Sequence, residues 1–177
     1  KYYFVQNYKI SKIKKILKEI MIPKTHILLF MGKNDNKLFN TMSEKEIDQY
    51  LKINLIDQIK ITNCLLKNYI LFKPNIYVFS STFVNIKSFS SPIYSSSKLF
   101  LENIFKSISV IYNKLSIKLS VIKIGLVEGG LKKRINYQNE KLLYKYQKNK
   151  KINLETLSKN IIKILYEKRK KSLYRIY

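Results

Sequence analysis

The chain has 177 residues, of which 46% are hydrophobic and 26% charged, and its formal net charge at pH 7 is +24. This length suits one domain with a buried core, and the composition excludes an intrinsically disordered chain. The single cysteine, Cys64, excludes an internal disulfide and favours a reducing compartment, either the cytoplasm or the reducing interior of an organelle. No apolar run reaches the ~18 residues of a transmembrane helix, so we expect no membrane span.

Lysine supplies nearly all of the positive charge, because arginine occurs only at positions 134, 169 and 175. Lys, Ile, Asn and Tyr are abundant, whereas Gly, Pro and Ala are scarce, as expected from AT-rich codons. A protein that reads phosphates or bases would use more arginine. We therefore attribute the charge to codon usage and expect no nucleic-acid partner. A basic module that binds nucleic acid or an acidic protein is the non-enzymatic alternative.

Short apolar runs alternate with helical periodicity along the chain. The apolar runs predict strands at 2–5, 26–31, 76–79, 118–124 and 173–177. Apolar residues spaced three and four apart predict helices at 12–22, 44–66, 94–112 and 154–167. Ser11 should cap the first helix and Pro23 should end it. Ser43 and Glu46 form a capping box for the second helix, on which Leu51 should face inward.

This alternation predicts a Rossmann-like, doubly wound α/β fold, in which helices cover both faces of a parallel sheet. Residues 1–177 should form one domain, with the polar, basic stretch 132–151 as a flexible flap or insertion. Ligands of such sheets bind at the carboxyl ends of the strands. Gly32, Ser81 and Gly125 each lie at or just after a strand end, so we expect them on one rim.

Tyr94 and Lys98 are four residues apart and should share one face of a helix. A lysine ammonium would lower the pKa of the tyrosine, which could then exchange a proton with a carbonyl or an alcohol. The pattern Tyr-x-x-x-Lys occurs seven times here, so spacing alone selects nothing. The pair at 94 and 98 is distinguished by what precedes it, a buried strand that ends in Ser80 and Ser81.

Ser81 could hydrogen-bond the same substrate oxygen, and Asn54 could hold a water or orient Lys98. The order of Asn54, Ser81, Tyr94, Lys98 and Gly125 resembles the short-chain dehydrogenase/reductase family, and the interval 94 − 81 = 13 matches the family's serine-to-tyrosine spacing. The segments that carry the resemblance are THILLFMGK, IKINLIDQ, VFSST, PIYSSSKLFLENIFKSIS and LSVIKIGLVEGG.

The resemblance implies an oxidoreductase that uses NAD or NADP and reduces a carbonyl or oxidises a secondary alcohol by hydride transfer. It implies that Tyr94 donates or accepts the proton, with Asn54, Ser81 and Lys98 as the other catalytic residues. It also implies that the helices beginning near Ser43 and Tyr94 pack in a homodimer or homotetramer. The residues implied to contact the cofactor are Tyr94, Lys98, Gly32, Gly125 and Asn7.

The chain also departs from the family pattern. The Gly-rich turn that holds the pyrophosphate is absent, and residues 2–7 match the third strand of the family. We therefore expect an N-terminally truncated or degenerate member, in which the strand end that selects NAD or NADP is missing. Asn7 replaces the usual acidic residue, and of the Asn-Asn-Ala-Gly turn only Gly32 is kept. Gly125 follows Ile124 instead of proline.

An enzymatic alternative is the extended branch of the superfamily, the nucleotide-sugar epimerases and dehydratases. Those enzymes need a sizeable C-terminal domain, whereas 177 − 125 = 52 residues follow Gly125 here. We expect no metal site, because His26 has no other metal-binding residue near it in the sequence. We expect His26 at a strand edge and Cys64 in the core.

Overall fold

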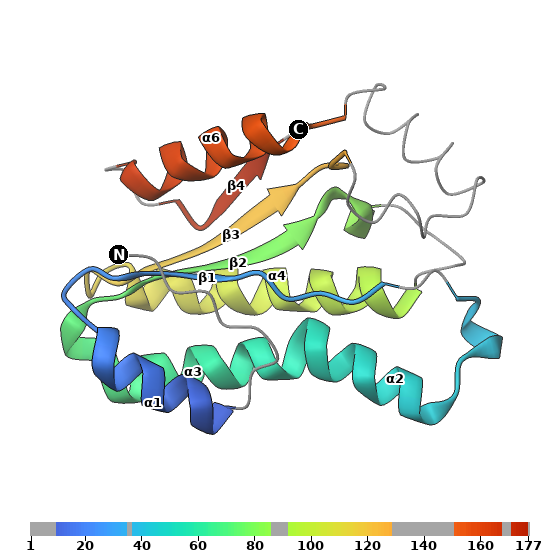
Figure 1. Cartoon of the computed structure of the whole chain (residues 1–177), viewed down its shortest axis with the longest axis horizontal. Coiled ribbons are helices and arrows are strands. Elements are labelled where there is room, and N and C mark those ends of the chain that lie inside the picture. Colours follow the sequence, from blue (N-terminus) through green and yellow to red (C-terminus); the bar gives the residue numbers. More distant parts are fainter. Residues whose placement is uncertain (1–9, 35–36, 86–91, 129–150, 168–170, 177) are drawn as a thin grey trace.

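The structure is a computed structural model of the chain, and it describes residues 10–34, 37–85, 92–128, 151–167 and 171–176 (Figure 1). The predicted strand at 2–5, Asn7 and all of the predicted flap except Lys151 lie outside the described residues. Among the described residues, no helix is long and apolar enough to cross a membrane.

A parallel sheet of four strands forms the centre of the described structure, in the order β1-β2-β3-β4. This arrangement confirms the predicted parallel α/β fold. The first strand ends two residues earlier than predicted, because Phe30 and Met31 leave the ladder and the Met31 N–H turns back to the Leu29 carbonyl. The strands are β1 His26–Leu29, β2 Asn75–Ser81, β3 Lys118–Ile124 and β4 Leu173–Ile176.

Five α-helices accompany the sheet in the described residues. The first begins earlier than predicted, so Ser11 lies inside it and is not its N-cap. It ends before Pro23. There the Thr25 hydroxyl accepts a hydrogen bond from the Ile22 N–H and donates one to the Ile22 carbonyl. The helices are α1 Ile10–Ile20, α2 Glu44–Leu51, α3 Asp57–Tyr69, α4 Pro92–Tyr112 and α6 Leu154–Tyr166.

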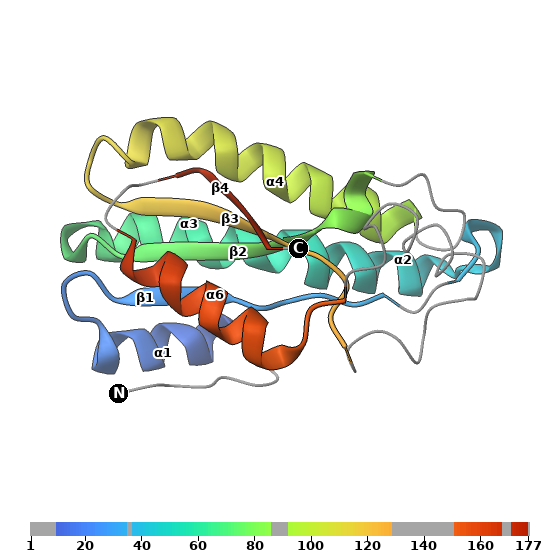
Figure 2. The ribbon, with the colours of Figure 1, turned by 90° about the horizontal axis from the view of Figure 1, so that it is seen from above.

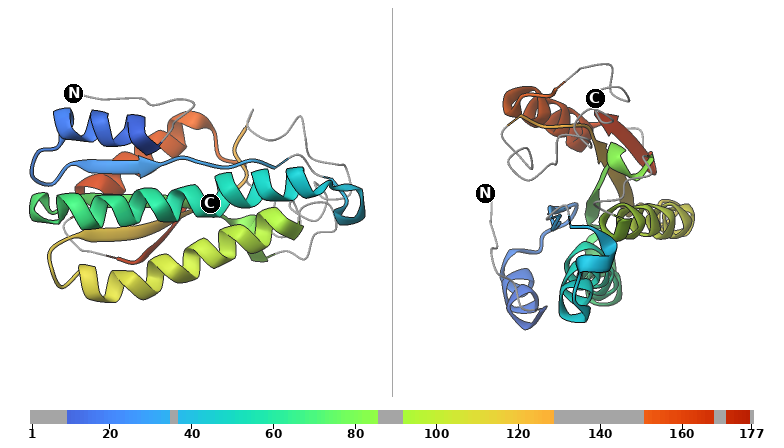
Figure 3. Two further views of the ribbon diagram at one scale, coloured as in Figure 1. Left: turned by 90° about the horizontal axis from the view of Figure 1, so that it is seen from below. Right: turned by 90° about the vertical axis from the view of Figure 1, so that its right-hand side faces the viewer.

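Helices cover both faces of the sheet (Figure 3). Side chains alternate along β2, so Ile76 and Val78 pack against α1, α3 and α4, whereas Tyr77 and Phe79 pack against α6. The central strands β2 and β3 are continuous apolar runs in the sequence, because both faces of the sheet are buried there. Each fully buried side chain of this kind, such as Ile76, contributes about 1.5–3 kcal/mol.

The connection from β3 to β4 has the opposite hand from the two before it. All three connections step in the same direction across the sheet. The helices α3 and α4 lie on one face, but α6 lies on the other (Figure 2, Figure 3). A helix that changes face without a change of direction reverses the handedness of its crossover.

The long helix predicted at 44–66 is divided by a π-helical turn, Lys52–Ile56, and runs on to Tyr69. The capping box of Ser43 and Glu46 is confirmed, since both of its hydrogen bonds are present. The wider turn rotates the inward face, because i→i+5 bonding adds a residue to that turn. Leu51, predicted to face inward, is therefore 37% exposed, while Asn54 is fully buried.

Candidate functional site

The three residues predicted to share a rim lie at the carboxyl end of the sheet, toward which the strand arrows point in Figure 1. Ser81 is the last residue of β2 and pairs with Ile124, the last of β3. Gly125 follows directly, and its N–H donates to the Ile176 carbonyl at 2.8 Å. Gly32 comes three residues after the end of β1. Parallel strands end together, so the rim forms as predicted.

Tyr94 lies in the first turn of α4, buried, and its hydroxyl shares a hydrogen bond with the side chain of Ser81. Burial raises the pKa of Tyr94 above its ordinary value, and the hydrogen bond with Ser81 only partly opposes this. The predicted lowering of this pKa by Lys98 is therefore wrong for the structure. Desolvation of the phenolate outweighs any help from the ammonium.

Lys98 is buried one helical turn after Tyr94, and its Nζ donates to two main-chain carbonyls. These are the Met31 carbonyl at 2.6 Å and the Phe79 carbonyl at 2.9 Å. Among the described residues, no carboxylate forms an ion pair with it. Burial therefore lowers the pKa of Lys98 to about 7. Lys98 also joins the chain after β1 to strand β2, directly below the rim.

Asn54 is presented by the π-helical turn and binds the chain just after Gly32. Its Oδ1 accepts the Lys33 N–H at 2.8 Å, and its Nδ2 donates to the Lys33 carbonyl at 2.9 Å. A Cβ placed on Gly32 would lie 3.6 Å from both Asn54 Oδ1 and Lys98 Nζ. Asn54 and Lys98 therefore meet around Gly32, as the sequence predicted for one site.

Gln58 is a member of this cluster that sequence analysis missed. Its Nε2 donates to the Asn54 carbonyl at 2.8 Å and to the Met31 carbonyl at 3.2 Å, the same carbonyl that accepts from Lys98. Its Oε1 is buried and has no hydrogen-bond partner among the described residues. Polar residues at 54, 58 and 62, spaced one turn apart along one helix face, were the signal that could have found it.

A buried ion pair beneath the rim was also missed. Glu102 on α4 lies 3.2 Å from the Nζ of Lys123 on β3, and both side chains are nearly inaccessible. Its other partners are Lys106 at 2.7 Å and the Ser80 hydroxyl at 3.3 Å. Burial raises the pKa of Glu102, but the two lysines outweigh burial and hold this pKa below its ordinary value. The pair fastens α4 to the sheet one turn after Lys98.

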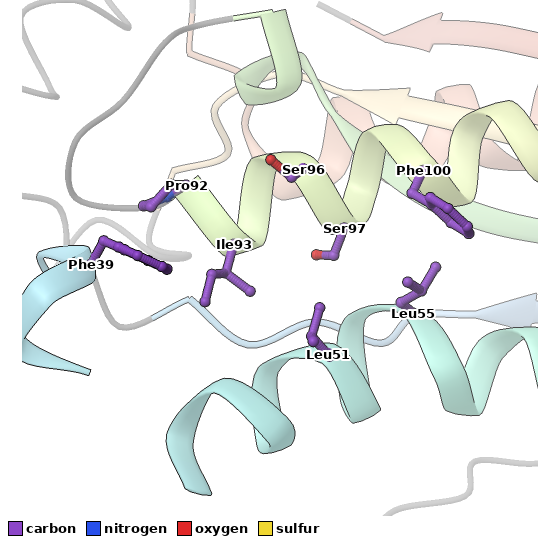
Figure 4. A pocket seen from close by; sticks show the side chains of 8 residues that line it. All are labelled: Phe39, Leu51, Leu55, Pro92, Ile93, Ser96, Ser97 and Phe100. Carbon is purple, nitrogen blue, oxygen red and sulfur yellow. The ribbon is translucent and has the colours of Figure 1, made fainter. Parts of the chain in front are cut away.

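An apolar pocket of about 330 Å³ lies beside the site (Figure 4). It opens between α2 with the π-helical turn and the first turns of α4, next to the short 3-10 helix Phe39–Thr41. Ser97, on its wall, donates to the Tyr94 carbonyl at 2.9 Å. Its lining residues are Phe39, Leu51, Leu55, Pro92, Ile93, Ser96, Ser97 and Phe100.

Other predicted residues lie away from the cluster. Gly125 is on the rim, but nothing places it against Lys98 or Asn54. His26 starts β1 at the opposite end of the sheet, stacked on Tyr77, and burial together with Lys118 lowers its pKa. Among the described residues, no three His, Cys, Asp or Glu side chains could hold a metal ion. Cys64 is only partly buried, so its predicted place in the core is wrong.

Comparison with known families supplies the assignment. A family model described as short chain dehydrogenase matches residues 11–140. The chain belongs to the short chain dehydrogenase family. This confirms the family predicted from the order of Asn54, Ser81, Tyr94 and Lys98, and it makes the chain a member of an oxidoreductase family. Comparison with curated protein sequences finds no match.

Solved structures of short chain dehydrogenases share the fold. A 4-hydroxyisoleucine dehydrogenase complexed with NADH has 13% identity and a TM-score of 0.75, over 94% of this chain and 73% of that one. ElxO with NADP bound has 17% identity and a TM-score of 0.75, over 94% and 71%. A short-chain dehydrogenase from Streptomyces avermitilis has 11% identity and a TM-score of 0.76, over 95% and 66%.

Proposed function

We propose that this short chain dehydrogenase is an NAD(P)-dependent oxidoreductase that reduces a carbonyl or oxidises a secondary alcohol. The observation that carries the proposal is the hydrogen bond between Tyr94 and Ser81 at the carboxyl end of the sheet, with buried Lys98 one turn away. Two hydroxyls held within hydrogen-bond distance of each other can both donate to the oxygen of one carbonyl substrate.

In the reductive direction, Tyr94 donates its proton to the carbonyl oxygen, and Ser81 hydrogen-bonds the same oxygen. A nicotinamide bound at the rim would supply the hydride that reduces the carbonyl carbon to the alcohol. The raised pKa of Tyr94 keeps its proton in place at neutral pH until the substrate oxygen becomes basic. An ammonium at Lys98 then stabilises the tyrosinate that remains, and Asn54 holds the loop against which Lys98 lies.

The residues at the rim fit a nucleotide. An ammonium has three N–H donors, and Lys98 uses two of them on main-chain carbonyls, so one is left for a nucleotide oxygen. Gly32 allows close approach beside Lys98, because no side chain projects there. We assign Tyr94, Lys98, Gly32 and Gly125 to the cofactor side, and we add Asn7, which lies outside the described residues, on the family resemblance alone. These 177 residues contain no Gly-rich turn for the pyrophosphate.

We also propose that the protein assembles as a homodimer or homotetramer through α4 and the helices after Ser43. On α4, four apolar side chains are exposed by 41–63%, and such surfaces favour burial in an interface. Sedimentation equilibrium tests this, and a monomer at micromolar concentration would contradict it. The four side chains are Leu99, Phe100, Val110 and Ile111.

The decisive experiment compares nucleotide binding with turnover in the purified protein. NADH and NADPH fluorescence measures binding, and oxidation of the nucleotide with a panel of ketones and aldehydes measures turnover. Tyr94→Phe should bind the nucleotide as the wild type does but lose at least about 10²–10⁴-fold in kcat, the usual size of general acid catalysis.

Tyr112→Phe is the matched control, since it makes the same change at the far end of the same helix and should keep full activity. If neither nucleotide binds, the proposed function is wrong. Turnover that survives in Tyr94→Phe would instead remove Tyr94 from the mechanism.

A further inference from the structure

The amino ends of the strands form a second surface, at the end of the molecule opposite the rim. Three tight turns meet there, at residues 21–25, 70–74 and 113–117, and we call them the amino-end turns (Figure 1, Figure 2). The first two are bonded directly, because the Lys24 N–H donates to the Phe72 carbonyl at 2.8 Å. The third precedes β3, which lies beside β2 in the sheet.

Each amino-end turn holds an apolar side chain out into solvent. Leu71 is 90% exposed, Ile22 66% and Leu115 51%. The ring of Tyr166, which is 78% exposed, lies 6.4 Å from His26 at the start of β1 and extends the same surface. Exposed apolar side chains that gather on turns at one end of a molecule mark an interaction surface.

Each amino-end turn also carries an exposed lysine, and none of the three contains an acidic residue. Lys24 and Lys73 stand at φ 63° and 49°, in the left-handed region, where Gly or Asn is less strained. The third turn has Lys114 beside Leu115. The lysine charge is therefore placed on the turns at some conformational cost, next to the exposed apolar side chains.

We propose that the amino-end turns bind the surface of a bilayer that contains anionic phospholipid. Ile22, Leu71 and Leu115 enter the headgroup region, while the lysines pair with phosphate and carboxylate groups at its surface. A second copy of the chain does not fit against this surface, because the amino-end turns offer three exposed lysines and no acidic side chain to pair with them. A nucleic acid would use the lysines and leave the apolar side chains in water. The rim, at the opposite end, stays open to solvent.

Vesicle co-sedimentation tests the proposal with the purified protein. Vesicles of mixed phosphatidylcholine and phosphatidylserine should bind it, vesicles of phosphatidylcholine alone should bind it far less, and added salt should weaken binding. Ile22→Ser with Leu71→Ser should lower the affinity by about tenfold or more. Lys24→Asn with Lys73→Asn should lower it by a similar factor, and asparagine tolerates the left-handed turns, so folding is preserved.

Two control variants change similar residues elsewhere and should bind as the wild type does. Leu154→Ser removes a side chain that is 64% exposed at the start of α6, and Lys45→Asn with Lys60→Asn removes two exposed lysines from α2 and α3. No binding to the mixed vesicles overturns the proposal, as does an equal loss in the controls. If the two serine substitutions leave binding unchanged while duplex DNA binds as well, the surface is a general anion site and the lipid proposal is wrong.

Discussion

Lys98 is a buried cation whose described partners are two carbonyl oxygens. Its pKa of about 7 puts the change from ammonium to amine in the neutral range. In the unfolded chain Lys98 stays protonated up to its ordinary pKa of 10.5. Between about pH 7 and pH 10.5, folding therefore releases the proton of the Lys98 ammonium. Lys98 therefore costs stability, and this cost is greatest below about pH 7 and falls as pH rises toward 10.5.

Replacing Lys98 with methionine should expose this pH dependence. The free energy of unfolding of Lys98→Met minus that of the wild type should be most positive at pH 7 and below. It should fall with rising pH by up to about 1.4 kcal/mol per unit. Urea denaturation at several pH values measures it. The variant also loses the hydrogen bonds to Met31 and Phe79, and this loss shifts the difference in unfolding free energy by the same amount at every pH. A difference that does not change with pH would contradict the lowered pKa of Lys98.

At the scale of elements, a buried ion pair connects α4 to the sheet. Glu102 joins α4 to Lys123 on β3, with the Ser80 hydroxyl as a further donor. Burying two charges costs desolvation free energy, and their mutual attraction offsets this cost only while both partners are present. Its position one turn after Lys98 ties the alignment of Lys98 to an interaction with a distant strand.

Removing one partner should therefore cost more than removing both. Glu102→Leu should lower the free energy of unfolding by about 3–5 kcal/mol, because Lys123 is left charged and buried. Adding Lys123→Met should restore most of that loss, as urea denaturation of both variants would measure. Glu155→Gln breaks the exposed pair with Lys159 and should cost under about 1 kcal/mol. A double variant as unstable as the single one would contradict this.

For the whole molecule, charge repulsion opposes folding. Thirty-five basic residues face eleven acidic ones, so a folded chain concentrates a charge of +24 in a small volume. Salt screens this repulsion over about 10 Å at 0.1 M. The melting temperature should rise by several degrees between low and moderate salt, equally with NaCl and KCl, in thermal unfolding followed by circular dichroism. A fall with salt would show that ion pairs outweigh the repulsion.

The sequence by itself determined the four described strands to within two residues, the parallel sheet, the place of Ser81 at a strand end, and that of Tyr94 and Lys98 one turn apart on a helix. These follow from local patterns: continuous apolar runs for strands buried on both faces, and a four-residue spacing on one helix face. Strand ends of a parallel sheet fall on one edge, so the residues that follow those ends can be grouped from the order of the chain alone. The predicted strand 118–124 has the same limits as β3, because its continuous apolar run is buried on both faces of the sheet.

Only the tertiary structure decided the electrostatics and the side-chain partners. Lys98 bonds a carbonyl 67 positions away, Gln58 reaches back 27 positions, and Glu102 meets a strand 21 positions later. No local pattern encodes such pairs. The pKa values of Tyr94 and Lys98 depend on burial, which comes from packing and not from the four-residue spacing. The π-helical turn at Asn54 and the side of the sheet on which α6 packs also depend on contacts between segments that are far apart in the chain.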